Sequence, residues 1–267
     1  MLNLNLQQKL YYALRFASAM CFIGHGAFGF ITKPIWCNYF AVAGIGKVMA
    51  YHLMPWVGGF DIFCGILMLV YPMRIVPVWL VIWGTATALM RPMSGEPFAE
   101  FIERAGNFGA PLALLMISGG VRLNLKNWRT LIDTDVQPDA KVLKNVTTCL
   151  KLVVFLLLAG HGWLNLIEKQ GLVGQYASLG FNDTAYTAHV IGALEIAAAI
   201  TVLIKPIRTV ILIFFVWKVI SELFYPHYEI FEWIERGGSY GCILALWFAL
   251  KKAEVSQPAT STNLQMG

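Results

Sequence analysis

The sequence predicts an all-α integral membrane protein with eight transmembrane helices, arranged as two parallel four-helix repeats. Composition is the first indication, because 58% of the 267 residues are hydrophobic and 13% are charged, whereas an average soluble domain has roughly 25% charged residues. Eight apolar runs of about the length needed to cross a bilayer are the second. An internal duplication is the third, and it predicts that both halves share one fold.

Two pairs of motifs carry the duplication. The matched segments are Gly24-His25-Gly26 with Lys33, Gly160-His161-Gly162 with Lys169, and Glu103-Arg104 with Glu235-Arg236. The offset is 136 residues for the first pair and 132 for the second. A unit of about 130 residues therefore occurs twice, and each copy is expected to supply four spans.

Residue ranges for the elements follow from the apolar runs. We expect spans at 10–32, 55–73, 76–93, 106–122, 146–168, 187–205, 207–226 and 236–251. The first repeat is then 1–122, the linker 123–145, the second repeat 146–252 and the tail 253–267. The tail is polar without an apolar period, so we expect it to be disordered.

Lysine and arginine predict the orientation of the spans. Thirteen of them lie in one set of connecting segments and six in the other, which is a positive-inside bias. Both termini and the linker are therefore expected in the cytoplasm, at a bacterial inner membrane. Each repeat has an even number of spans, so the repeats run the same way and are expected to be related by an axis along the membrane normal.

Two short stretches precede the fourth and eighth spans, at 96–104 and 227–236. Aromatic residues and isoleucines alternate with acids in them at roughly helical spacing. This pattern predicts amphipathic helices on the outer surface with their rings in the interface. A redox partner outside the cytoplasm, or another membrane subunit, is expected to dock there.

Ionisable residues inside spans are costly in lipid and indicate functional sites. The orientation above places most of them toward the outer face. The set is His25, Lys33, Asp61, Arg91, His161, Lys169, Glu195, Lys218 and Glu222. Trp217 lies close to them along the spans and could form the wall for a flat ligand.

Matching positions predict a buried histidine–carboxylate pair in each half, His25 with Asp61 and His161 with Glu195. Three interpretations stay open. An imidazole beside a carboxylate passes protons near neutral pH, as a quinone head group requires. Two histidines could instead be the axial ligands of a haem b. The pairs could also be polar clamps that only hold helices together.

The halves differ within the third and seventh spans. Lys218 and Glu222 are separated by one helical turn, and their counterparts are Ala86 and Met90. We therefore expect a polar pathway in the second half, and the third span, 76–93, to serve mainly for packing.

Several functions are excluded or disfavoured by the residues. The basic residues flank apolar runs, so the net charge of +5 does not indicate nucleic-acid binding. The five cysteines form no CxxC pair, so neither a zinc site nor a cysteine-ligated iron–sulfur cluster is expected. The sequence contains no Walker loop, dinucleotide fingerprint, HExxH or GxSxG motif.

Each half resembles the DoxX-like superfamily of four-helix membrane proteins. The Gly-His-Gly motif with its downstream lysine carries the resemblance, as do Gly58-Gly59-Phe60-Asp61 and Gly192-Ala193-Leu194-Glu195. That superfamily includes the membrane subunit of archaeal thiosulfate:quinone oxidoreductase, the methylamine-utilisation protein MauE and Surf-type cargo receptors. The resemblance implies a quinone-linked membrane subunit, with functional positions at His25, Lys33, Asp61, His161, Lys169 and Glu195.

The expected function is thus a subunit of an electron-transfer system that binds quinone near the extracytoplasmic face. His161 and Glu195 would exchange protons, Lys169 and Arg91 would counter negative charge, and Glu222 with Lys218 would extend the path. If the protein is an enzyme, it is part of a quinone-linked oxidoreductase. The alternatives are a non-enzymatic scaffold or assembly factor, and a transporter of small solutes or lipids.

Overall fold

A computed structural model describes residues 4–120, 125–134, 138–225 and 229–255. Within these ranges the regular elements are all helical, and no β-strand occurs. Four helices are long and apolar enough to cross a membrane: α3 (Lys47–Val70), α4 (Ile75–Met93), α8 (Ala140–Leu166) and α10 (Thr184–Ile204). These features confirm the predicted all-α class and indicate a membrane protein.

The four apolar helices correspond to the predicted spans 55–73, 76–93, 146–168 and 187–205. The other predicted spans fall on α1 (Leu6–Phe30), α6 (Ala105–Ile117), α11 (Arg208–Ser221) and α13 (Gly237–Val255). The shorter elements are α2 (Trp36–Val42), α5 (Ala99–Glu103), α7 (Leu125–Trp128), α9 (Gln170–Ser178), the 3₁₀ turn η1 (Glu222–Phe224) and α12 (Ile230–Glu235).

Some helix ends differ from the predicted ends of the spans and the linker. The seventh span was expected to reach residue 226, but the α-helix ends at Ser221 and tightens into η1. The linker was expected to reach residue 145, but α8 begins at Ala140 because the Asp139 side chain accepts a hydrogen bond from the Val142 amide. Of the predicted tail, residues 256–267 lie outside the described part, and α13 runs to Val255.

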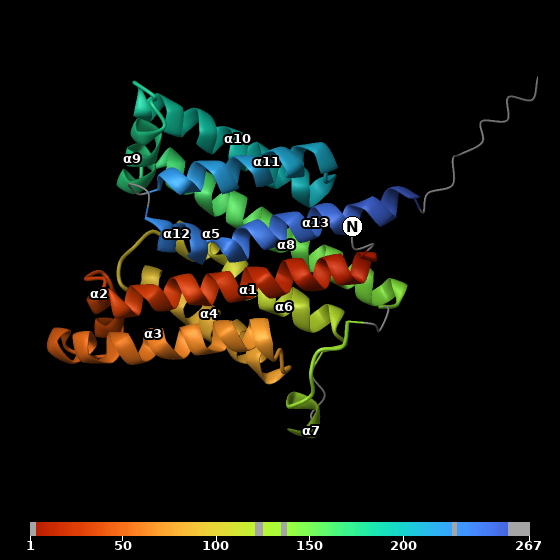
Figure 1. Cartoon of the computed structure of the whole chain (residues 1–267). Helices are drawn as coiled ribbons and strands as arrows, with labels where there is room; N and C mark the ends of the chain where they lie inside the picture. The colour runs from red at the N-terminus through yellow and green to blue at the C-terminus, as the bar shows by residue number, and fades with distance from the viewer. Residues whose placement is uncertain (1–3, 121–124, 135–137, 226–228, 256–267) are drawn as a thin grey trace, which may run out of the picture.

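Two long helices lie in the middle of the molecule (Figure 1). α1 packs against α3, α6, α12 and α13, and α8 packs against α10, α6, α5 and α13. Figure 1 shows α3 and α4 on one side of this centre and α10 and α11 on the other. Leucines fill the core between the central helices, among them Leu10, Leu14, Leu150, Leu157 and Leu246.

Glycines permit the closest helix contacts. A Cβ atom placed on Gly24 would lie 2.7 Å from Cα of Glu235, and one on Gly160 would lie 2.7 Å from Cα of Glu103. The first glycine of each Gly-His-Gly motif therefore packs against a short helix from the other half of the chain, α12 or α5. Close backbone approach of this kind is the usual function of small residues between membrane helices.

Amphipathic surface helices were expected at 96–104 and 227–236, and the short helices α5 and α12 lie there. Residues 227 and 228 are outside the described part. Glu100 and Glu232 are 3% and 6% exposed. Phe98 and Ile230 have exposed side chains, as expected for the apolar edge. The prediction is wrong for the acids, which turn inward because basic side chains from distant segments meet them there.

Candidate functional site

The structure forms both histidine–carboxylate pairs. Nδ1 of His25 on α1 lies 2.7 Å from Oδ2 of Asp61 on α3, and Nδ1 of His161 on α8 lies 2.6 Å from Oε2 of Glu195 on α10. Asp61 and Glu195 are completely buried. With Nδ1 engaged by a carboxylate, Nε2 of each ring is left for other partners.

The His161 pair has two further polar neighbours that sequence reasoning missed. The Tyr176 hydroxyl donates to Oδ1 of Asn165 at 2.7 Å, and Nδ2 of Asn165 donates to Oε2 of Glu195 at 3.1 Å. Asn165 follows His161 by one helical turn, so its spacing was a usable signal. Tyr176 lies on α9, and only tertiary packing brings it here.

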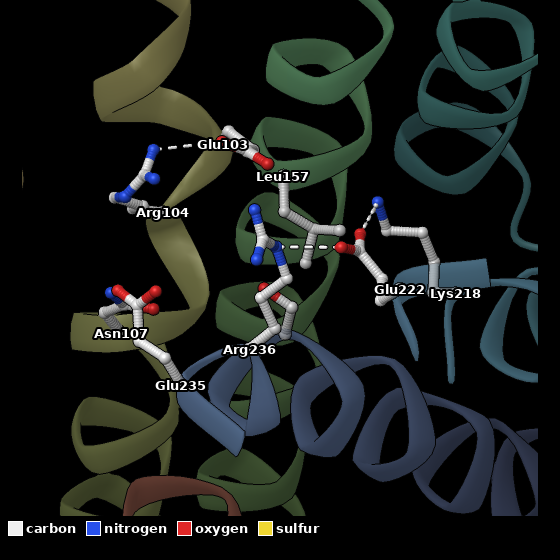
Figure 2. A pocket seen from close by; sticks show the side chains of 9 residues that line it. Glu103, Arg104, Asn107, Leu157, Lys218, Glu222, Glu235 and Arg236 are labelled. Atoms are coloured by element: carbon white, nitrogen blue, oxygen red, sulfur yellow. Dashed lines mark hydrogen bonds and ion pairs between the residues drawn. The ribbon is translucent and has the colours of Figure 1, made fainter. Parts of the chain in front are cut away.

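Charged side chains continue this cluster across the interior. Nζ of Lys218 lies 2.7 Å from Oε1 of Glu222 and 3.9 Å from Oε1 of Glu195. Nε2 of His161 lies 3.7 Å from Oε1 of Glu222. Figure 2 shows Glu222 between Lys218 and Arg236, whose Nε is 2.8 Å from Oε2 of Glu222. The chain therefore brings His161, Glu195, Lys218 and Glu222 together, as their sequence positions predicted.

The two predicted lysines connect the halves. Lys33 forms an ion pair with Glu232 of α12, and Nζ of Lys169 lies 2.7 Å from Oε1 of Glu100 of α5. Each acid also pairs with an arginine one helical turn later. Arg236 lies 3.0 Å from Glu232, and Arg104 lies 2.6 Å from Glu100. The lysines thus bind acids of the opposite half.

These ion pairs shift the pKa of the acids. Burial alone would raise the pKa of Glu232, but the charges of Arg236 and Lys33 outweigh it and lower the pKa to about 2. The pKa of Glu100 is likewise lowered, because Arg104 and Lys169 overcome the effect of burial. Both groups are therefore ionised near neutral pH and act as fixed parts of the scaffold.

A cavity of about 590 Å³ opens beside His25. Its walls are largely aromatic and apolar, with Phe28, Trp36, Tyr39, Phe40, Trp83 and Tyr225 among the residues that line it. The rings of His25 and Trp36 are in contact, with centroids 4.7 Å apart and planes tilted by 31°. Small-molecule sites have volumes of roughly 300–1,000 Å³ and mainly apolar walls with a few polar groups, so this cavity has the size and composition of a ligand site.

Span 76–93 was expected to serve mainly for packing, and the polar pathway was expected in the second half. The large cavity instead lies against the helix of that span, α4. α4 contributes Ala86, Met90 and Arg91 to the cavity wall. The short side chain of Ala86 leaves space where its counterpart, Lys218, is buried in an ion pair. Arg91 also pairs with Glu96 at 3.0 Å and with Glu100 at 3.3 Å.

Other predicted site residues lie away from the large cavity. His25, Lys33, Arg91 and Lys169 line it, whereas Asp61, His161, Glu195, Lys218, Glu222 and Trp217 do not. Trp217 instead packs against the small apolar cluster that contains Leu172 and Tyr176. Lys218 and Glu222 line a second cavity of about 20 Å³ (Figure 2), together with Arg104, Glu235 and Arg236.

A haem with two histidine ligands does not fit this arrangement. His25 lines the large cavity, but His161 is 2% exposed and its Nε2 faces Glu222. A porphyrin between the two rings would have to displace the ion pairs around Glu222. In the described ranges, no group of three or more histidine, cysteine or acidic side chains is arranged to hold a metal ion.

In the described ranges, fold and site together define an all-helical protein with four helices long and apolar enough to cross a membrane, two histidine–carboxylate pairs and a large cavity with aromatic walls. No protein-family model, curated protein or solved structure matches the chain.

Proposed function

We propose that this chain is a DoxX-like, quinone-binding subunit of an electron-transfer system in a bacterial inner membrane. In this proposal eight helices cross the bilayer as two parallel repeats, and both termini lie in the cytoplasm. The electron donor is a redox partner on the extracytoplasmic side or another membrane subunit.

Matched packing supports the two-repeat arrangement. α1 packs on α3 as α8 packs on α10, and α4 packs on α6 as α11 packs on α13. Each half also places its short helix against the other half, since α12 packs on α1 and α5 packs on α8. Such reciprocal contacts are typical of repeats related by a two-fold axis along the membrane normal.

The observation that carries the proposal is the large cavity with His25 in its wall. A quinone ring is flat, and the aromatic side chains around His25, which include Trp36 and Trp83, suit its faces. A quinone that receives two electrons from its donor takes up two protons. The Asp61 contact at Nδ1 orients the His25 ring, which leaves Nε2 for proton exchange with a ligand oxygen.

Quinone binding by purified protein in mild detergent tests the proposal. We expect decylubiquinone to bind the wild type, and His25→Ala to weaken binding by at least roughly tenfold, or about 1.4 kcal/mol. His189→Ala is the control, because His189 is exposed and pairs with Glu168, which is also exposed. Absence of quinone binding to folded wild-type protein, together with absence of co-purified quinone, would refute the proposal.

A scaffold or assembly role is the second candidate, and the ion pairs between the halves favour it. Lys33 with Glu232 and Lys169 with Glu100 could serve only to clamp helices. In that case His25→Ala would leave the partner complex assembled and active, whereas substitutions at exposed Phe98 or Phe231 would disrupt the complex.

A further inference from the structure

Glu235 places a largely buried carboxyl group on the wall of the large cavity. Glu235 is 5% exposed, and its side chain makes no hydrogen bond or ion pair with any residue of the described ranges. The other acids on the wall are paired: Glu96 and Glu100 with Arg91, and Glu232 with Lys33. The Glu235 carboxyl group is therefore open to an occupant of the large cavity.

Helix packing brings Glu235 next to His25. The backbone of Glu235 contacts Gly24, where a Cβ atom would come within 2.7 Å of Cα of Glu235. His25 is the next residue on α1, and both side chains line the same cavity. The cavity wall therefore carries two titratable side chains from two different segments.

The equivalent residue in the first half is not free. Glu103 accepts a hydrogen bond from Arg104 at 3.0 Å and also lines the small cavity. Glu235 and Glu103 occupy matched positions in the duplicated motif, so the motif alone does not leave a carboxylate unpaired. The difference coincides with the location of the large cavity, which Glu235 lines and Glu103 does not.

Charged and titratable groups face Glu235 from several elements. They are Cys21 and His25 on α1, Arg104 between α5 and α6, Glu222 on η1, and Arg236 and Tyr240 at the start of α13. None of them lies within ion-pair distance of Glu235, although Arg104 and Arg236 pair with other acids.

The small cavity provides a route to Glu235 from the other side. Glu235, Arg104 and Asn107 line both cavities, and Glu222 and Lys218 line the small one alone. Its volume of about 20 Å³ is enough for a single water. One water there would connect Glu235 with Glu222, which faces His161.

We propose that Glu235 is the second proton-exchanging group of the large cavity, where its protonated carboxyl donates a hydrogen bond to a carbonyl oxygen of the occupant. When electrons from the redox partner reach a bound quinone, this proton moves to the quinone oxygen. The carboxylate then regains a proton through the small cavity from the Glu222 and His161 side. The inference rests on the proposed quinone function and adds the class of ligand atom that is recognised.

The pH dependence of decylubiquinone binding tests this proposal. Because only a neutral acid can donate a hydrogen bond, the proposal requires the affinity of wild-type protein to fall with rising pH, by at most about tenfold per pH unit. E235Q keeps a donor at every pH, so its affinity should stay nearly constant, apart from the contribution of His25. E235A should bind weakly throughout. E229Q is the matched control, because Glu229 is an exposed acid just before α12.

Each outcome has a distinct meaning. Identical pH profiles for E235Q and wild type would overturn the role of Glu235 while leaving quinone binding intact. An affinity that rises with pH would also overturn it, and would indicate a cationic ligand paired with ionised Glu235. No binding at any pH would refute the proposed function itself. Infrared spectra of the wild-type protein provide a second test that needs no variant. The carbonyl band of the protonated acid should shift when quinone binds. An unchanged band would overturn the inference.

Discussion

Nζ of Lys169 lies 2.7 Å from Oε1 of Glu100, a residue 69 positions earlier in the chain. Lys33 binds Glu232 in the opposite direction. Each half therefore supplies the cation for an acid on the short helix of the other half. The halves are joined by ion pairs as well as by leucine packing, so disrupting one pair should weaken the whole fold.

A double-mutant cycle on Lys169→Met and Glu100→Gln should measure this connection. We expect a coupling free energy of roughly 1–3 kcal/mol, because Glu100 is buried and the pair is partly desolvated. Unfolding in mixed detergent micelles provides the measurement. The matched control is the cycle on the exposed His189 and Glu168, for which coupling below about 1 kcal/mol is expected. Equal coupling in both cycles would contradict the prediction.

Acid should weaken the fold through Glu232. The pKa of Glu232 is about 2 in the folded protein, against 4.5 for an ordinary glutamate. A lowered folded pKa contributes stability that is complete above the ordinary pKa and is lost as pH falls through the folded one. The free energy of unfolding should therefore decline between about pH 4.5 and pH 2. E232Q should be less stable at neutral pH and should show a shallower decline, and parallel pH curves would argue against this cause.

Gly24→Ala should destabilise the protein by roughly 1–3 kcal/mol. A Cβ atom there would meet the backbone of Phe231 and Glu235, which cannot move as a flexible side chain would. Gly174→Ala is the control, since a Cβ atom there would meet nothing within 4 Å, and alanine favours a helix by about 1 kcal/mol over glycine. Thermal unfolding in detergent should separate the two, and similar melting temperatures would be unexpected.

Filling the large cavity should block the ligand without affecting the ion pairs. Ala86→Phe adds a ring to the cavity wall, and we expect decylubiquinone affinity to fall by roughly tenfold or more, equal to about 1.4 kcal/mol. Ala193→Phe is a size-matched control on an exposed position of α10. If both variants bind quinone equally well, the ligand occupies another place.

Local patterns were sufficient for much of the fold. The apolar runs predicted the all-α class and the positions of α3, α4, α8 and α10, because helix formation and membrane solubility depend on short stretches of sequence. Most predicted ends lie within a few residues of the helix ends, except that α3 begins at Lys47 and α8 begins at Ala140. The duplication aligned His25 with His161 and Asp61 with Glu195, and adjacent helices place both pairs in contact. Lys218 and Glu222, spaced by four residues, pair on one helix face for the same local reason.

Tertiary packing decided the rest. Glu100 and Glu232 turn inward because their basic partners come from distant segments, and no local period reports on such partners. The large cavity depends on what several helices leave unfilled around Ala86 and His25. Glu103 is paired with Arg104, whereas Glu235 lines the large cavity, although the two occupy matched positions in the repeated motif. The motif alone therefore does not decide what each glutamate contacts.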